Sequence, residues 1–176
     1  MNYHVNACEK SRKSRQGVYS KMLSTISKDD IFLITVTMNC RDAEEIYGYI
    51  ERETGAVLTG GRDYPTLDIL PNEEDENYEE LEAEFNRRYL PIPQEGSKDS
   101  YQDMVDFIET VADERLRDLL GVAIQGRGAF GRFKDVLRRS EYESECNRWF
   151  AFSQECEYCR VLEWLVSKGF SVEVGF

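Results

Sequence analysis

The segment Asp113–Leu137 reads DERLRDLLGVAIQGRGAFGRFKDVL and contains two amphipathic patterns separated by a glycine turn. The first pattern follows Asp113, whose short carboxylate can accept a hydrogen bond from the first turn of a helix. Gly126 is well placed to end this helix in the left-handed conformation. The apolar face of the next helix would be Phe130, Phe133 and Leu137. The segment therefore predicts two consecutive helices that bury one face each.

The same helical periodicity extends to both sides of this segment. Ser100 and Asp103 form a plausible N-terminal cap for a preceding helix, whose apolar face is Tyr101, Met104, Val105, Ile108 and Val111. Two further helices are expected after Leu137, and the second of them would be capped by Ser153 and closed by Gly169. Their large aromatic residues lie at helical spacing, which favours a place in the core for Trp149, Phe150, Phe152 and Trp164.

Strand patterns dominate the first third of the chain. Residues Ile31–Met38 are β-branched and end in alternation, which predicts a half-buried strand, and Arg41–Glu45 suggests a short helix or turn. Tyr47–Arg52 and Ala56–Thr59 are expected to pair as a hairpin, because Gly55 can supply the positive φ of a tight turn. A last strand over Ser171–Val174 would return to this sheet.

An acidic segment, Glu73–Glu84, follows a loop that contains Gly60, Gly61, Pro65 and Pro71. Tyr78, Leu81 and Phe85 recur at helical spacing, which predicts an acidic helix with one apolar face and an ion pair between Glu84 and Arg88. A sharper alternative is a mimic of nucleic-acid charge. Arg88–Pro93 must be extended, because Pro91 and Pro93 restrict the residues before them.

The net charge of −12 is unevenly distributed over the 176 residues. Residues 1–28 carry a balance of +5, with a basic run at Ser11–Arg15, whereas residues 71–118 carry −11. An acidic body repels phosphate backbones, which disfavours general nucleic-acid binding except through the basic arm, and also anionic membranes. No run approaches the ~18 apolar residues of a membrane span, and no secretion signal is evident. We expect a cytoplasmic protein with a basic, mobile arm over 1–28 and a single domain over 29–176.

A glycine pattern, Gly126-x-Gly128-x-x-Gly131, matches the dinucleotide-binding fingerprint literally. That fingerprint requires a strand before it, whereas a helix is expected here, so we interpret the match as coincidence. The start of the following helix could still attract an anion through its backbone N–H groups. The candidate ligand-binding residues for an anion are Gly126, Arg127, Gly128, Arg132 and Lys134. The alternative is that the glycines cap and pack while the bases pair with acidic helices.

The sequence contains few residues suited to catalysis or to metal binding. The single histidine, His4, lies in the arm, and a Ser or Cys nucleophile usually needs a histidine base. Cys156-x-x-Cys159 lacks the further ligands that zinc requires, and Cys146 would lie ~15 Å from Cys156 along a continuous helix. The five cysteines are therefore expected to be reduced thiols, and we predict no catalytic residue, no metal and no cofactor.

Several motifs occur together in one order: Arg88–Pro93, Met104–Ile108, Gly126–Phe130 with Phe133–Asp135, Trp149–Phe152 and Glu163–Leu165. Over about residues 46–170 this resembles the bacterial Uncharacterised Protein Family 0158. The resemblance implies a bacterial protein whose activity is not established, so it implies no catalytic residue. Gly131 departs from the arginine expected in relatives, and the cysteines at 146, 156 and 159 are not part of that pattern.

These observations predict an α+β fold, with a small antiparallel sheet (the N-terminal hairpin) packed with a C-terminal helical bundle. The leading functional hypothesis is a non-enzymatic binding or regulatory module that acts through a protein partner. The alternative is a small-molecule or nucleotide-phosphate binder, with enzymatic activity left open, that uses the basic Gly-Arg-Gly helix start. An exposed apolar patch would favour the first hypothesis, and a closed basic pocket would favour the second.

Overall fold

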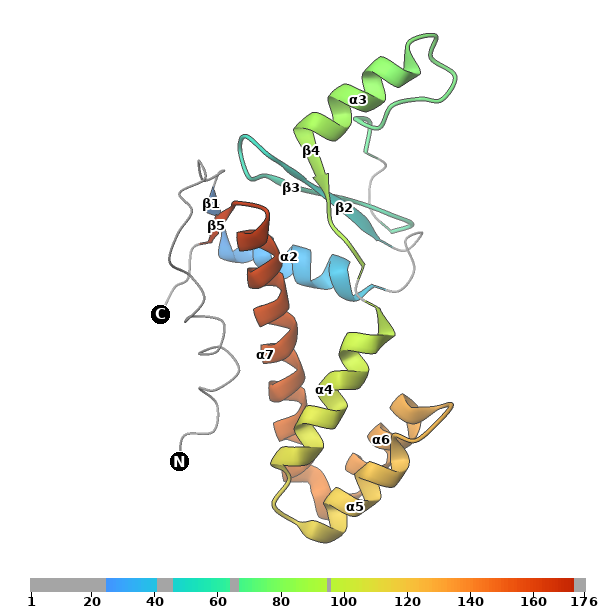
Figure 1. Cartoon of the computed structure of the whole chain (residues 1–176), viewed down its shortest axis with the longest axis vertical. Coiled ribbons are helices and arrows are strands. Elements are labelled where there is room, and N and C mark those ends of the chain that lie inside the picture. Colours follow the sequence, from blue (N-terminus) through green and yellow to red (C-terminus); the bar gives the residue numbers. More distant parts are fainter. Residues whose placement is uncertain (1–24, 41–45, 64–66, 95, 173–176) are drawn as a thin grey trace. The chain divides into compact units, whose positions relative to one another are not determined.

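The computed structural model describes residues 25–40, 46–63, 67–94 and 96–172 (Figure 1). Its elements in chain order are β1 (Thr25–Ile26), α2 (Lys28–Asn39), β2 (Tyr47–Glu51), β3 (Val57–Gly60), α3 (Tyr78–Arg88), β4 (Tyr89–Pro91), α4 (Ser97–Thr110), α5 (Glu114–Ala123), α6 (Ala129–Leu137), the short 3-10 helix η1 (Ser140–Tyr142), α7 (Glu143–Ser167) and β5 (Ser171–Val172). This mixture of helices with a small antiparallel sheet confirms the predicted α+β class.

The chain forms two compact units. Unit 1 contains the described residues up to Pro93 and those from Cys159 onward, and unit 2 is Gln94–Tyr158. The long helix α7 contributes residues to both. The predicted basic arm over 1–28 lies outside the described residues as far as residue 24, and a single domain over 29–176 stays a prediction.

Residues 31–38 form most of α2, so the strand predicted from their β-branched side chains is wrong. The helix begins after Ser27, whose hydroxyl oxygen accepts a hydrogen bond from the backbone N–H of Asp30 at 3.1 Å. Its buried apolar positions are three or four residues apart, which is the spacing of a helix face: Ile31, Ile34 and Met38.

The sheet of unit 1 is three-stranded and antiparallel, in the order β3-β2-β4. The predicted hairpin is confirmed, and its turn contains Gly55 with a φ of 79°. On one face of β2, Gly48 leaves room for Ile92 and the neighbouring strand, because an added Cβ would lie 2.9 Å from Ile92 and 3.1 Å from the carbonyl oxygen of Leu58. Alternation along β2 directs Tyr47 and Tyr49 to the opposite face.

The chain's last described strand does not join that sheet. β5 pairs in parallel with β1, with Ser171 opposite Thr25, so the predicted return to the hairpin sheet is wrong. Residues 173–174 of the predicted strand, like the predicted turn at Arg41–Glu45, lie outside the described residues.

Unit 2 is built from α4, α5, α6 and the first part of α7 around an aromatic cluster. The ring of Phe107 lies 5.2 Å from Trp149 and 6.2 Å from Phe133, and the last two rings are 4.8 Å apart, centroid to centroid. Edge-to-face packing of this kind stabilises the fold beyond what the burial of large apolar surface contributes. Cys146 and Phe152 pack against the same core.

Two predicted helix boundaries in this region are wrong. α4 begins at Ser97 after Gly96, so Ser100 and Asp103 do not cap it. α7 runs without a break through Ser153, whose hydroxyl donates to the carbonyl of Phe150 at 3.2 Å instead of capping a new helix. Phe150 is 48% exposed and so does not belong to the core, whereas the predicted end at Gly169, with a φ of 90°, is confirmed.

Candidate functional site

The predicted anion-binding residues surround the turn between α5 and α6. Gly126 and Gly128 both have positive φ, 72° and 79°, and Gly128 is the N-cap of α6. Arg127 and Lys134 are exposed, and Lys134 lies about 9 Å along α6 from the N-cap at the rise of an ideal helix. As expected, a helix (α5) and not a strand precedes the glycine pattern.

Arg132 has a different set of partners from those expected of an anion ligand. Its guanidinium donates hydrogen bonds to the backbone carbonyls of Ala123, at 3.0 Å, Gln125 and Arg127. Ala123 is the last residue of α5, where the helix dipole is negative, and Gln125 and Arg127 belong to the turn that follows, so the cation satisfies the helix end and the turn together. Arg132 therefore braces the turn, and anion binding by the cluster stays a prediction.

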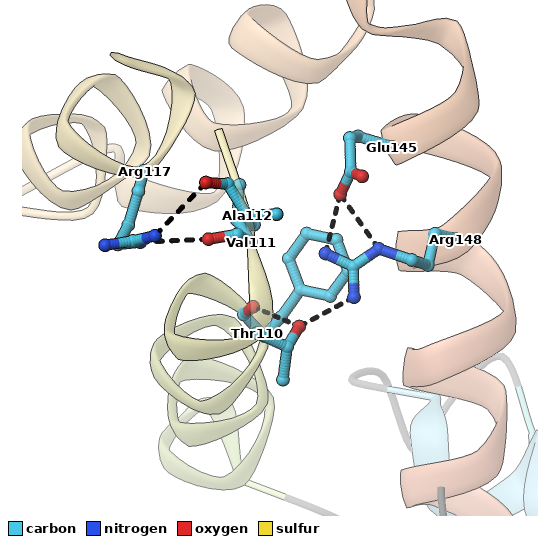
Figure 2. Close-up of polar contacts among 7 residues, drawn as sticks. Thr110, Val111, Ala112, Arg117, Glu145 and Arg148 are labelled. Carbon is cyan, nitrogen blue, oxygen red and sulfur yellow. Dashed lines mark hydrogen bonds and ion pairs between the residues drawn. The ribbon is translucent and has the colours of Figure 1, made fainter. Parts of the chain in front are cut away.

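The corner between α4 and α5 is braced in the same way (Figure 2). Arg117 of α5 donates to the carbonyls of Val111, at 2.9 Å, and Ala112, at 3.3 Å, just beyond the end of α4. This arginine is not among the residues that the sequence pattern predicts to be functional. Its spacing after the predicted cap at Asp113 is the signal that could have indicated its role.

Arg148 of α7 completes the polar contacts of Figure 2. Its guanidinium pairs with Glu145 at 2.6 Å, donates to the hydroxyl of Thr110 at 2.7 Å, and lies 4.4 Å from the ring centroid of Phe107. The hydroxyl of Thr110 in turn donates to the carbonyl of Phe107 at 2.7 Å. These contacts join α4 to α7 within unit 2, so this arginine too is a structural brace.

Two open cavities lie among the described residues of unit 1, and Phe85 of α3 lines both. Phe85 packs edge-to-face on Tyr49 of β2, with centroids 5.0 Å apart, and lies 4.8 Å from Tyr89 of β4. Tyr49 lies 6.3 Å from Tyr47 on the same strand. A row of aromatic rings thus covers the face of the sheet that α3 approaches.

The smaller cavity, which we call the aromatic pocket, has a volume of about 340 Å³ and is lined by Tyr49, Leu70, Pro71, Tyr78, Glu82, Phe85, Asn86 and Pro91. The larger one, which we call the Arg88 groove, has a volume of about 490 Å³ and is lined by Asp68, Ile69, Leu70, Pro71, Asn72, Asp75, Leu81, Glu84, Phe85, Arg88 and Tyr89. Both are open to solvent and lie between α3 and the loop 67–72.

The surroundings of these cavities are strongly acidic. The segment 67–88 contains nine carboxylates and two arginines, a balance of −7. Arg88 does not pair with Glu84 as predicted: it bonds to Glu51 at 2.6 Å, while Glu84 pairs with Arg87 at 3.5 Å. One of the two cations is thereby committed to a carboxylate of β2, and the surface along α3 stays negative.

Glu51 and Arg88 stabilise each other's charged forms. The hydrogen bond from Thr54, at 2.5 Å, and then the one from Arg88 hold the pKa of Glu51 below its usual range, although burial acts in the opposite direction. In turn, the hydrogen bond to Glu51 and the charge of Glu51 raise the pKa of Arg88. This contact ties the end of β2 to the end of α3 and fixes one side of the Arg88 groove.

Tyr78 and Glu82 form the polar side of the aromatic pocket. The phenol of Tyr78 donates to the carboxylate of Glu82 at 3.2 Å, one helical turn away. The pKa of Tyr78 is raised, chiefly because the phenol is removed from water. The hydrogen bond to Glu82 and the charge of Glu82 raise it further. Tyr78 therefore stays a neutral hydrogen-bond donor whose hydroxyl orients the side chain of Glu82.

The part of the chain that the structure describes shows no metal site, no disulfide bond and no membrane-spanning helix. There, no group of three or more His, Cys, Asp or Glu side chains is placed to hold a metal ion. The described cysteines, Cys40, Cys146, Cys156 and Cys159, are not in disulfide bonds. No helix within the described ranges is long and apolar enough to cross a membrane.

Comparison with known proteins gives one match. The sequence pattern of the uncharacterised protein family UPF0158 matches residues 32–174, which is most of the chain. Neither the search of curated proteins nor the search of solved structures found a significant match. The chain therefore belongs to the uncharacterised protein family UPF0158.

Proposed function

We propose that this protein is a non-enzymatic binding or regulatory module that acts, in the cytoplasm of a bacterium, through a protein partner. The partner presents a basic, partly apolar segment to the surface between α3 and the loop 67–72. The observation that carries this proposal is an apolar floor beside a dense set of carboxylates. Ile69 and Leu70 are each 37% exposed, and both line the Arg88 groove with Phe85.

Two physical effects favour a basic, partly apolar partner at this surface. Covering exposed apolar side chains with a partner stabilises the complex by roughly 25 cal/mol per Å² of apolar surface removed from water. The balance of −7 over the segment 67–88 favours a partner of opposite sign and accelerates its approach. An acidic or nucleic-acid partner would be repelled by the same field.

The experiment uses the full chain and a short peptide of alternating lysine and leucine, with the glutamate–leucine peptide as the comparison. Binding is measured by isothermal titration calorimetry at low and at moderate salt. The test variant neutralises three exposed carboxylates of α3, as Glu79→Gln, Glu80→Gln and Glu84→Gln together. The matched control removes the same charge from exposed positions of unit 2, as Glu109→Gln, Asp118→Asn and Glu155→Gln.

We expect the basic peptide alone to bind, with an affinity that falls as salt rises. The α3 variant should lose about tenfold in affinity, which corresponds to about 1.4 kcal/mol, while the unit 2 variant should lose less than about twofold. Equal losses in the two variants would mean that the peptide senses only the overall net charge, and the proposal would be wrong. Tight binding of the acidic peptide would contradict it as well.

One observation supports the alternative, a small-molecule or nucleotide-phosphate binder. The exposed N-cap Gly128 has no capping side chain, and the exposed Arg127 precedes it in sequence. The first N–H groups of α6 could therefore meet an anion together with Arg127. Stabilisation of the full chain by inorganic phosphate, abolished in Arg127→Glu, would support this alternative, and an unchanged melting temperature would oppose it.

A further inference from the structure

We propose that the aromatic pocket binds the cationic head of a single lysine or arginine side chain of the partner. This inference rests on the proposed function, because it specifies how the basic segment is anchored. The Arg88 groove would then accept the apolar part of the same segment.

The composition of the pocket favours a cation. Its walls combine three aromatic rings, from Tyr49, Tyr78 and Phe85, with two prolines, and the one ionisable side chain of opposite sign to the ligand is Glu82. The faces of aromatic rings attract cations, most strongly where water is partly excluded. No lysine or arginine lines the pocket, so nothing on its walls repels a positive charge.

The two cavities differ in the one respect that matters for this ligand. The Arg88 groove is lined by one guanidinium, which Glu51 already neutralises, and by three carboxylates, those of Asp68, Asp75 and Glu84. The aromatic pocket shares Leu70, Pro71 and Phe85 with the groove, but it is lined by no lysine or arginine and adds the rings of Tyr49 and Tyr78. The carboxylates of the groove therefore attract the basic segment as a whole, whereas the aromatic pocket offers aromatic rings and one carboxylate to a single cationic head.

An apolar side chain would fit the aromatic pocket less well. Covering Glu82 and Asn86 without offering a donor would take water from both and leave the hydroxyl of Tyr78 as the donor to the Glu82 carboxylate. An ammonium or guanidinium head offers donors to both and places its hydrocarbon stem against the prolines. With a volume of about 340 Å³, the pocket lies at the small end of ligand sites, which suits one side chain.

The test uses the lysine–leucine peptide and a set of peptides in which each lysine in turn is replaced by norleucine, which keeps most of the stem and removes the charge. Each peptide is titrated into the full-length wild type and into Glu82→Gln and Tyr78→Leu. Glu82→Gln preserves the shape of an exposed side chain, so it remains informative if Tyr78→Leu perturbs the start of α3. Glu84→Gln is the matched control, because it removes the same charge from the same helix but lines only the Arg88 groove.

In the wild type, we expect one norleucine position to weaken binding about fivefold to tenfold more than the others. This positional difference should fall below about twofold in Glu82→Gln and Tyr78→Leu. In Glu84→Gln it should persist, although every peptide binds more weakly. If all norleucine positions cost the same in the wild type, the aromatic pocket holds no cationic side chain, yet basic-segment binding would stand. If the basic peptide fails to bind the wild type at all, the proposed function fails and this inference with it.

Discussion

Replacing Arg132 by alanine separates a structural role from an anion-binding role at the turn between α5 and α6. The substitution removes three hydrogen bonds to backbone carbonyls. The bond to Ala123 is part-buried, and the bonds to Gln125 and Arg127 are exposed. A sheltered hydrogen bond from a charged group contributes about 1.5–3 kcal/mol, whereas exposed ones are screened and add about 0–1 kcal/mol between them.

We therefore expect Arg132→Ala to lower the free energy of unfolding by about 2 kcal/mol. For a chain of this size, 1 kcal/mol corresponds to a shift of roughly 2–4 °C in melting temperature, so the variant should melt about 4–8 °C lower. Far-ultraviolet circular dichroism during heating measures this shift. Arg132→Lys should recover only part of the loss, because an ammonium cannot reproduce the geometry of the guanidinium fork.

Lys134→Ala is the matched control, since it removes one exposed positive charge from the same helix. Its melting temperature should change by less than about 2 °C, as for most surface substitutions. The reasoning is refuted if Arg132→Ala melts within about 1 °C of the wild type. It is also refuted if phosphate stabilises the wild type but not Arg132→Ala while the two apoproteins are equally stable.

Three further substitutions test other parts of the fold. Gly48→Ala should destabilise the protein by about 1–3 kcal/mol, measured as a lower urea midpoint, because its Cβ would lie 3.1 Å from the backbone carbonyl oxygen of Leu58, which cannot move aside as the Ile92 methyl group at 2.9 Å can. Asp113→Ala should cost about 1 kcal/mol, and Asp113→Asn much less, since the cap accepts the N–H of Leu116 at 3.1 Å. The fold lowers the pKa of Glu51, so the ionised carboxylate stabilises the protein above its ordinary pKa of 4.5, and this stabilisation is lost as the pH falls through the pKa of the folded state. Glu51→Gln should therefore flatten the acid limb of a profile of stability against pH. An unchanged acid limb would contradict the ion pair.

Local signals predicted the turns well. Gly55, Gly126 and Gly169 all adopt the positive φ that their positions at turns and helix ends require. Asp113 caps α5 as expected. These features depend on a few neighbouring residues, so the sequence alone is sufficient to place them.

Residues 31–38 were misassigned because two periodicities compete there. β-Branched side chains and the alternation of Ile34, Val36 and Met38 with threonines favour a strand. In the structure Thr35 and Thr37 donate their hydroxyls to carbonyls one turn earlier, at 2.8 and 2.9 Å, so Thr37 can be fully buried in a helix. Burial of the helical face then outweighs the intrinsic preference for a strand.

The aromatic pocket could be predicted only in part. The spacing of Tyr78 and Phe85 on one helix face was recognised, as was the hairpin that contains Tyr49. Their meeting depends on how α3 lies against the sheet, and Tyr49 and Tyr78 are far apart in the sequence, with β3 between them. No local pattern carries that information, and the same is true of the bond between Arg88 and Glu51.

The most direct test of the central claim is the affinity of the lysine–leucine peptide for three proteins: the wild type, the α3 triple variant and the unit 2 triple variant. Both variants carry the same change in net charge, so only the place of the charge differs. The account predicts about a tenfold loss for the α3 variant and less than about twofold for the other. Equal affinities of the two variants would contradict it.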